Sequence, residues 1–433
     1  MVNTRLLLNI SHSRNCHWLS LSTLIQKLAT VKARDTASQI KNCDALLVCQ
    51  DTDRGYLFNK KAYSQILDSL GEKINKDGLK TQSLSGSFSI LNGERAYGSP
   101  LTINRFLLKN ILYSKILNIL LGDLRGELWL QDQKKSNWQK ILKNCNAKIV
   151  FAIQPEIALC RAGHELGIRI FDVQHGVISD SADNPYYYGK NLLTKEIDDL
   201  PHGYLCWNDS SATVLEPMRL EKEFSVHVIG NPWLDRFAEP EKNDQLVQAE
   251  LLMSHKIEQP SILVTLQHSM YENASDYVSN GVMATALENV IKKTCDKFFW
   301  YIRLHPAQNV DVGFTKNYLH DTFGHLPNID WNISSRMALP VILQRLNLHI
   351  THFSAATIEA ACMGIKTGLL DPHIRFGGKH ADLYSFEISQ GYAKVIELNE
   401  ISIISFIVSS LKSPTSKLSE DKKIPILSLF NTN

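Results

Sequence analysis

Short apolar runs that suit buried strands alternate with helical segments through most of the chain. Clear examples of such runs are Ala45 to Cys49, Lys148 to Ile153, Ile168 to Val173 and Ser261 to Leu266. This alternation is typical of α/β proteins with parallel sheets. Ligands of an open parallel sheet bind at the carboxyl ends of its strands, so we expect the functional residues directly after these runs.

The length and a change in composition predict two domains. A chain of 433 residues suits two separate cores better than one. The composition turns polar between Glu239 and Asp244, shortly after Gly230-Asn231-Pro232. We therefore expect an N-terminal domain over residues 1–235, a linker over 236–258 and a C-terminal domain over 259–433. In the first domain we also expect an amphipathic helix from Lys61 to Leu70.

Charge and cysteine usage narrow the class of protein. The formal net charge is only +2, whereas a dedicated nucleic-acid binder normally carries a basic stripe, so we expect no nucleic-acid partner. The eight cysteines form no Cys-x-x-Cys pair, which indicates buried thiols in a reducing compartment. We find neither a signal-peptide pattern nor an apolar segment long enough to span a bilayer, and so expect a cytoplasmic protein.

The strand that ends at Val173 runs directly into Gln174-His175-Gly176. Gly176 permits a sharp turn and a close approach of a ligand to the backbone. His175 is a candidate general base, and Gln174 is placed to orient a hydroxyl or carboxylate. Glu156, after the preceding strand, is a further candidate acid or base. Nearby residues that suit a carboxylate role or a carbohydrate platform are Asp172, Asp180, Asp183 and Tyr186 to Tyr188.

Two strand ends in the second half carry residues suited to a phosphate. His305-Pro306 follows the strand Phe298 to Ile302, and Pro306 restrains the histidine before it. His305 and Arg303 can each donate to a phosphate oxygen. The segment from Ser354 to Glu359 flanks a predicted helix start, where Ser354 and Thr357 serve either as caps or as anion contacts. Glu359 suits either a cap or ribose hydroxyls, and Gln267 would face the same ligand.

The sequence offers little for a metal ion or a cofactor. Asp51-Thr52-Asp53 has the spacing of a carboxylate pair for a hard cation, but it is short and far from the other motifs. We therefore expect metal-independent chemistry and no cofactor beyond the substrate itself. The segment Phe106 to Leu121 is apolar with two lysines, and suits either a core helix or a helix on a membrane surface.

The order of these motifs resembles the GT-B glycosyltransferases of bacterial surface polysaccharides. The Gln174-His175-Gly176 turn, the Gly230-Asn231-Pro232 link, His305-Pro306 and the Ser354 segment carry this resemblance. The last two are similar to the His-Pro and Ser/Thr motifs of CMP-sugar transferases that act on Kdo or sialic acid. The chain has Ser354-Ala355 in place of a serine pair and lacks an evident acidic-acidic-Gly motif. A similar motif order occurs in CDP-glycerol glycerophosphotransferases.

The resemblance implies an α/β, GT-B-like fold of two Rossmann-like domains that face across a cleft. It implies transfer of a sugar from a nucleotide-sugar donor, CMP-linked in the first instance, to a glycan or glycolipid acceptor. His305, Pro306, Arg303, Ser354, Thr357, Glu359 and Gln267 would hold the donor, with peripheral contact at the inner membrane. Alternatives are a sugar-nucleotide epimerase of the related fold, a glycerophosphotransferase-like enzyme, and a non-catalytic glycan-binding or assembly subunit.

Overall fold

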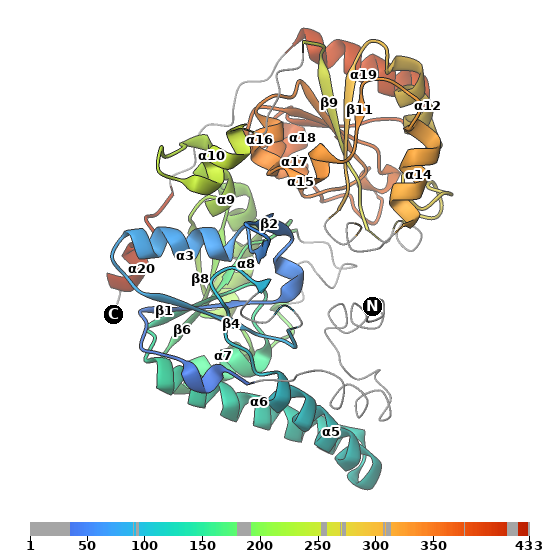
Figure 1. The fold of residues 1–433 in the computed structure, drawn as a ribbon. Helices are drawn as coiled ribbons and strands as arrows, with labels where there is room; N and C mark the ends of the chain where they lie inside the picture. Colours follow the sequence, from blue (N-terminus) through green and yellow to red (C-terminus); the bar gives the residue numbers. More distant parts are fainter. Residues whose placement is uncertain are drawn as a thin grey trace. The chain divides into compact units, whose positions relative to one another are not determined.

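The chain folds into two compact units, each built on a parallel sheet (Figure 1). The computed structural model describes residues 35–89, 91, 95–179, 192–252, 258–268, 270, 274–305, 308, 313–375, 377–413 and 423–431. Unit 1 comprises Met1–His175, Lys190–Trp233 and Asp421–Asn433, and unit 2 comprises Gly176–Gly189 and Leu234–Glu420.

Unit 1 contains a six-stranded sheet in the order β4-β1-β5-β6-β7-β8. Every neighbouring pair is parallel, as the alternation of strands and helices predicts. The strands are β1 (Ala45–Cys49), β4 (Thr81–Ser85), β5 (Ile149–Ala152), β6 (Arg169–Val173), β7 (Gly203–Cys206) and β8 (Ser225–Val228). The inner strands are apolar on both faces because helices cover both.

Two helical layers enclose this sheet. One face packs against α5 (Asn104–Leu121), α6 (Asp123–Cys145) and α7 (Ile157–Leu166), whose core residues include Trp138 and Leu159. The other face packs against α3 (Leu67–Lys76) and α20 (Ser428–Asn431), through residues such as Leu70 and Leu429. Helix α8 (Asp209–Lys222) lies beside β7 and β8.

The C-terminal segment belongs to unit 1, although the sequence assigned everything after residue 258 to the second domain. Ile424 donates its N–H to the carbonyl of Val228 at 2.8 Å, which fastens the segment to β8. Ile426 and Leu429 then enter the unit 1 core, and Arg169 donates to the carbonyl of Leu429 at 2.5 Å. These few apolar residues carry no periodicity from which their place could be predicted.

Unit 2 contains a second six-stranded parallel sheet, in the order β11-β10-β9-β12-β13-β14. Its strands are β9 (Ser261–Thr265), β10 (Phe299–Arg303), β11 (Ile329–Asp330), β12 (Leu348–Thr351), β13 (Lys366–Leu369) and β14 (Ala393–Val395). Helices α12 (Thr285–Thr294), α14 (Phe314–Phe323) and α19 (Glu400–Lys412) pack on one face. Figure 1 shows α15 (Ile333–Arg336), α16 (Leu339–Leu343), α17 (Ala356–Cys362) and α18 (Ser385–Ser389) on the other.

The predicted helix from Lys61 to Leu70 is wrong in its first half. Residues Lys61–Tyr63 form β3, which pairs antiparallel with β2 (Tyr56–Phe58), and α3 begins only at Leu67. The turn between the strands places Asn59 and Lys60 at φ values of 50° and 65°. Two consecutive left-handed residues are typical of a tight hairpin turn, whose sequence signal here lacks the usual glycine.

Helices α5 and α6 form a hairpin that extends beyond the sheet of unit 1 (Figure 1). Gly122 turns the chain between them at φ +91°, a conformation that side chains rarely adopt. A Cβ at Gly126 would collide with Asn118, so the glycine permits the close approach of the two helices. Within the described part of the chain, no helix is long and apolar enough to cross a membrane.

Candidate functional site

The carboxyl ends of four strands of unit 2 lie in register. Arg303, Thr265 and Thr351 are paired side by side at the ends of β10, β9 and β12, and Leu369 of β13 follows next to Thr351. The chain leaves β9 toward β10 and leaves β12 toward β13, so the strand order reverses between β9 and β12. Such a switch point opens a crevice between the two following loops, where α/β proteins bind ligands.

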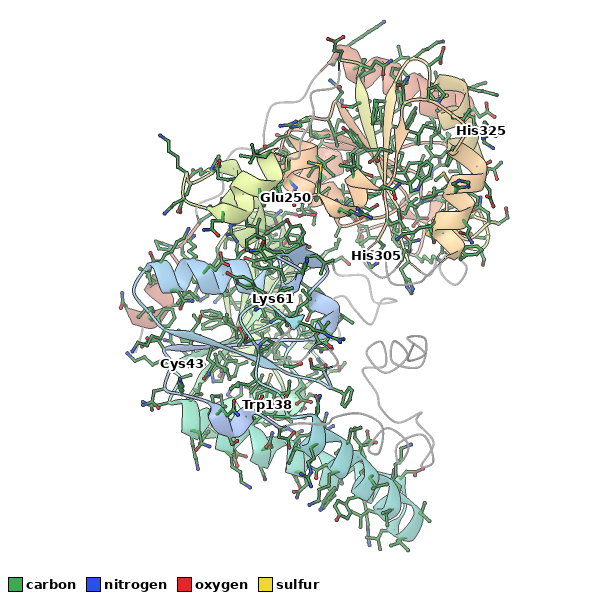
Figure 2. The ribbon with its side chains drawn as sticks, in the orientation of Figure 1. Cys43, Lys61, Trp138, Glu250, His305 and His325 are labelled. Atoms are coloured by element: carbon green, nitrogen blue, oxygen red, sulfur yellow. The ribbon has the colours of Figure 1, made fainter. Side chains whose placement is uncertain are left out.

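The loops after β9 and β10 bring two histidines together. The ring centroids of His268 and His305 lie 6.1 Å apart, and both residues are exposed. Figure 2 shows His305 and His325 at different ends of unit 2, as expected from their positions after β10 and before β11. Gln308, which is buried, accepts the N–H of His305 at 2.9 Å and donates to the carbonyl of Gln267 at 3.0 Å.

Gln308 thus ties the two loops together, and sequence analysis missed it. The only signal was its position three residues after His305. Gln267 itself is buried at this edge, as expected for a residue that ends a strand. Pro306, the second residue of the predicted His-Pro motif, lies outside the described residues, so its role stays a prediction.

Arg303 differs from the expectation. Its Nη1 donates to the backbone carbonyl of Met337 at 2.7 Å and to that of Ser334. The guanidinium therefore holds the segment around α15 instead of presenting Nη1 to a phosphate. Arginine suits this task because its planar group reaches several carbonyls at once. Arg303 positions this edge through Nη1, and its predicted donation to the donor phosphate stays a prediction.

The loop after β12 carries the Ser/Thr segment. Ser354 Oγ accepts the N–H of Ala356 at 3.3 Å, which is the capping role that its residue type predicts. Thr357 is fully buried, and its Oγ1 has no hydrogen-bond partner among the described residues. Helix α17 has only seven residues, so the charge of a long helix dipole contributes little here. The hydroxyls of Ser354 and Thr357 are therefore the groups of this segment that suit an anionic ligand.

Glu359 is half-buried in the first turn of α17, two residues after Thr357. Burial raises the pKa of Glu359 to about 7, although the positive charge of Arg303 opposes this rise. A carboxyl group poised in this way ionises or accepts hydrogen bonds readily when a ligand brings new donors. Its predicted contact with the ribose hydroxyls remains a proposal.

Further titratable groups gather after β13, and sequence analysis did not select them. Asp371 is fully buried and accepts from His380 Nδ1 at 2.6 Å. His373 Nε2 lies 2.8 Å from a carboxylate oxygen of Asp276. Tyr277 contacts the rings of both His352 and His373, with centroids 5.9 and 6.0 Å away. The sequence showed only that Asp371-Pro372 follows a strand, which is a weak signal by itself.

In unit 1, the predicted catalytic residues His175 and Gln174 differ in exposure. His175 is exposed directly after β6, where a ligand would meet it. Gln174 is buried, since its amide donates to Ser211 at 3.0 Å and accepts the N–H of Trp207 at 2.7 Å. Gln174 therefore fixes the turn, and the expectation that it orients a substrate group stays a prediction.

Glu156 also has a structural role. One carboxylate oxygen accepts the indole N–H of Trp138 at 2.6 Å, and the other lies 2.7 Å from Lys134 Nζ. Both partners lie on α6, so Glu156 fastens the start of α7 to that helix. These contacts give Glu156 a structural role, and its predicted acid or base role stays a prediction.

The remaining candidates lie either among the described residues of unit 1 or outside the described residues. Asp51 accepts from the hydroxyl of Ser89 at 2.8 Å, and Asp53 accepts the N–H of Gln50 at 3.0 Å, so both aspartates cap local backbone and loops. In the described ranges, no group of three or more His, Cys, Asp or Glu side chains has the geometry of a metal site. Asp172 is buried and caps Gln154. Outside the described residues lie Asp180, Asp183 and Tyr186 to Tyr188.

Comparisons with known proteins agree on the fold. No protein-family model matches the chain, and no curated protein matches it by sequence. Among solved structures, UDP-GlcNAc 2-epimerase from Methanocaldococcus jannaschii, in complex with UDP-GlcNAc and UDP, is similar with a TM-score of 0.52 and 13% identity. The match covers 85% of this chain and 92% of that one.

Two further structures are similar at the same level. A putative UDP-N-acetylglucosamine 2-epimerase from Listeria monocytogenes has a TM-score of 0.50 and 10% identity, over 86% of this chain and 88% of that one. A variant of the Wall Teichoic Acid Polymerase TagF soaked with CDPG has a TM-score of 0.50 and 12% identity, over 95% and 89%. The chain therefore has the two-domain, Rossmann-like architecture of GT-B proteins, as the sequence predicted.

Proposed function

We propose that the protein is an enzyme that acts on a nucleotide-linked substrate and binds the nucleotide at the carboxyl edge of the unit 2 sheet. One observation carries this proposal. The loops that follow β9, β10 and β12 bring Gln267, His305 and Ser354 to the switch point of that sheet. Histidine and hydroxyl side chains at such an edge suit a phosphate, because they donate hydrogen bonds to its oxygens.

Each residue of this edge has a distinct role in the proposal. His305, exposed beside His268, donates to the phosphate nearest the transferred group. Ser354 and Thr357 offer hydroxyls to the same phosphates, and Glu359 accepts from the ribose hydroxyls. Fixed donors aimed at a departing phosphate stabilise its charge as the bond breaks, which is the electrostatic contribution expected at such a site.

We propose group transfer from a UDP- or CDP-linked donor as the reaction. The similar structures were determined with UDP-GlcNAc, UDP or CDPG, which favours these nucleotides over the CMP-linked donor expected from the motifs. The transferred group is then a sugar or a glycerophosphate-like unit, and the acceptor a surface glycan or glycolipid. His175, exposed after β6 in unit 1, is the residue we propose as base toward the acceptor hydroxyl.

The second candidate is a sugar-nucleotide epimerase, which the likeness to the 2-epimerases supports. The two reactions differ in whether an acceptor is required. Incubation of the protein with UDP-GlcNAc alone distinguishes them, because an epimerase converts the substrate without a second reactant. A transferase leaves the sugar unchanged, apart from slow hydrolysis, until the acceptor is added.

Thermal stabilisation by CMP, CDP, UDP, GDP and ADP, each with and without magnesium, tests the nucleotide proposal. A ligand that binds only the folded protein raises Tm, by an amount that grows with its concentration over Kd. We expect a shift with UDP or CDP that His305→Ala abolishes and that His325→Ala leaves intact. A shift of the same size in folded His305→Ala contradicts the donor-site assignment, and no shift with any nucleotide contradicts the proposal as a whole.

We also propose that the tip of the α5–α6 hairpin contacts an anionic membrane surface. Ile119, Leu120 and Leu124 are 76%, 70% and 72% exposed at this tip, and Ile116, Leu121 and Leu128 are exposed beside them. Residues 104–145 carry eight basic and three acidic side chains, a net charge of +5 in a chain whose net charge is only +2. Four of the basic residues, Lys134, Lys135, Lys140 and Lys143, lie toward the base of the hairpin, and at the tip Lys115 and Arg125 are accompanied by Asp123 and Glu127. The apolar tip suits a bilayer interface, and the net positive charge of the whole hairpin adds an attraction to anionic headgroups.

A further inference from the structure

Asp371 and His380 form a hydrogen-bonded pair that no motif indicated. His380 Nδ1 lies 2.6 Å from one carboxylate oxygen of Asp371, and the other oxygen accepts the N–H of His373 at 2.9 Å. The carboxylate side chain is 0% exposed and the imidazole 14%. Burial opposes ionisation, but the hydrogen bonds from His380 and His373 outweigh it and lower the pKa of Asp371. Asp371 is therefore a carboxylate.

This pairing fixes the imidazole of His380. A carboxylate only accepts hydrogen bonds, so Nδ1 of His380 must carry a hydrogen. The other ring nitrogen, Nε2, is then an acceptor in the neutral ring and a second donor in the imidazolium. Among the described residues, Nε2 has no hydrogen-bond partner. The ring nitrogen that binds Asp371 is Nδ1, the other hydrogen bonds of His380, to His373 and Leu383, use its backbone, and its ring contacts Phe353 and His373 at 5.5 and 6.1 Å.

The pair lies directly beside the Ser354 loop. The N–H of Leu370 donates to Thr351 at 2.9 Å, and that of Asp371 donates to His352 at 3.2 Å, so the chain after β13 follows the chain after β12. Tyr384 donates its hydroxyl to the carbonyl of Phe353 at 2.6 Å and holds the same loop from the other side. His380 thus contacts Phe353, the residue immediately before Ser354.

We propose that His380, oriented by Asp371, is a further substrate-binding residue that donates its Nε2 hydrogen to a phosphate oxygen of a nucleoside diphosphate. This inference rests on the proposed function and extends the phosphate site from β9, β10 and β12 to the loop after β13. A buried carboxylate that binds one ring nitrogen fixes the direction of the other, so less ordering is needed when the phosphate arrives. In the imidazolium, Nε2 carries the hydrogen that the phosphate oxygen accepts.

The alternative is that the pair only fastens residues 371–380 to the unit, and His380→Asn separates the two roles. The asparagine amide retains a donor near the position of Nδ1 and removes Nε2, so the bond to Asp371 survives while the phosphate donor is lost. The matched control is His325→Asn, at a different end of unit 2 (Figure 2). Affinities for UDP, CDP and inorganic pyrophosphate are measured by titration calorimetry, and Tm without ligand reports the fold.

We expect His380→Asn to keep the ligand-free Tm and to weaken binding of UDP or CDP by about tenfold to a hundredfold, the range for a lost charge-assisted hydrogen bond. His325→Asn should bind as the unsubstituted protein does. Unchanged affinity in His380→Asn, or a loss fully explained by a lower Tm, overturns the assignment of His380 while the nucleotide proposal stands. If the unsubstituted protein binds none of the three probes, both proposals fall.

Discussion

The indole N–H of Trp138 donates to a carboxylate oxygen of Glu156 at 2.6 Å, and this bond joins helix α6 to the first residue before α7. Trp138 is buried, so the carboxylate is the partner that its indole needs inside the protein. The same carboxylate binds Lys134, which completes its hydrogen bonding on the α6 side. The arrangement is that of a structural contact within unit 1.

Glu156→Ala should therefore lower stability and spare chemistry. The substitution leaves a buried indole donor unsatisfied, which costs on the order of 1–3 kcal/mol. Urea unfolding measures this loss, and turnover of the folded variant should match that of the unsubstituted protein. Glu165→Ala serves as the control, because Glu165 pairs with Lys135 on the exposed part of the same helix pair and should cost about 0–1 kcal/mol. A catalytic role for Glu156 requires the opposite result, normal stability with lost turnover.

The sequence predicts the inner strands of both sheets well because their apolar runs are longer and more regular than any other signal in the chain. It does not predict the edge strands β4, β11 and β14. It predicts β1 residue for residue and the helix start after Ser354, since a buried strand and a capping hydroxyl are local features. It does not predict the contacts that Gln174 and Glu156 make within the protein, because these depend on residues distant in sequence. Trp138 lies 18 positions from Glu156.

The same limit explains why the Asp371–His380 pair was missed. The two residues are nine positions apart in a segment without regular structure longer than a short turn. Only the register of β12 and β13 brings that segment beside Ser354. A strand end with an aspartate is common, whereas an aspartate that binds a histidine at such an edge is a feature of the folded chain.

Thr357→Val tests the donor site without removing a hydrogen bond between described residues of the protein. The Oγ1 of Thr357 is buried and has no partner among the described residues, so removal of the hydroxyl should leave Tm unchanged or raise it. If a phosphate oxygen is the partner of this hydroxyl, the Tm shift produced by UDP or CDP should shrink, corresponding to a loss of about 1 kcal/mol of binding free energy. An undiminished nucleotide shift in Thr357→Val would remove Thr357 from the site.

Acid should destabilise unit 2 through two buried histidines. Burial lowers the pKa of His349 to about 3, and it lowers that of His352 to about 4 against the opposing charge of Asp371. His349 lies between the hydroxyls of Thr265 and Thr367, at 2.9 and 3.0 Å. Both rings are neutral in the folded protein, whereas an unfolded histidine binds a proton below a pKa of about 6.5.

The sign of the pH dependence follows from these values. Folding depresses the pKa of both histidines, so their contribution to the free energy of unfolding is fully present above about pH 6.5. This contribution is lost as pH falls toward the pKa values of the folded protein, by up to about 1.4 kcal/mol per pH unit for each histidine. Urea unfolding at pH 7, 6 and 5 measures the slope. His349→Gln should reduce the slope of the unfolding free energy with pH by the equivalent of about one proton taken up on unfolding. His320→Gln, on an exposed surface, should leave the slope unchanged. Equal slopes in both variants would show that His349 does not carry the effect.

The α5–α6 hairpin should lose membrane affinity when its apolar tip is made polar. Transfer of a leucine side chain out of water contributes about 1.5–3 kcal/mol, so Leu120→Asp with Leu124→Asp should reduce binding to vesicles at least about tenfold. The measurement is co-sedimentation with vesicles of phosphatidylcholine alone or with phosphatidylglycerol, at low and high salt. The protein should co-sediment only with vesicles that contain the anionic lipid, and less of it should co-sediment at high salt. The reason is that the exposed basic residues of the hairpin add an electrostatic attraction.

Leu220→Asp is the matched control for this pair of substitutions. Leu220 is 75% exposed on α8 of the same unit, and α8 has no other large apolar residue that is exposed. Its replacement should therefore leave vesicle binding unchanged. Light scattering without lipid shows whether the tip instead joins two copies of the chain. A protein that ignores both kinds of vesicle, and whose mass falls on Leu120→Asp with Leu124→Asp, would assign the tip to self-association and contradict the membrane proposal.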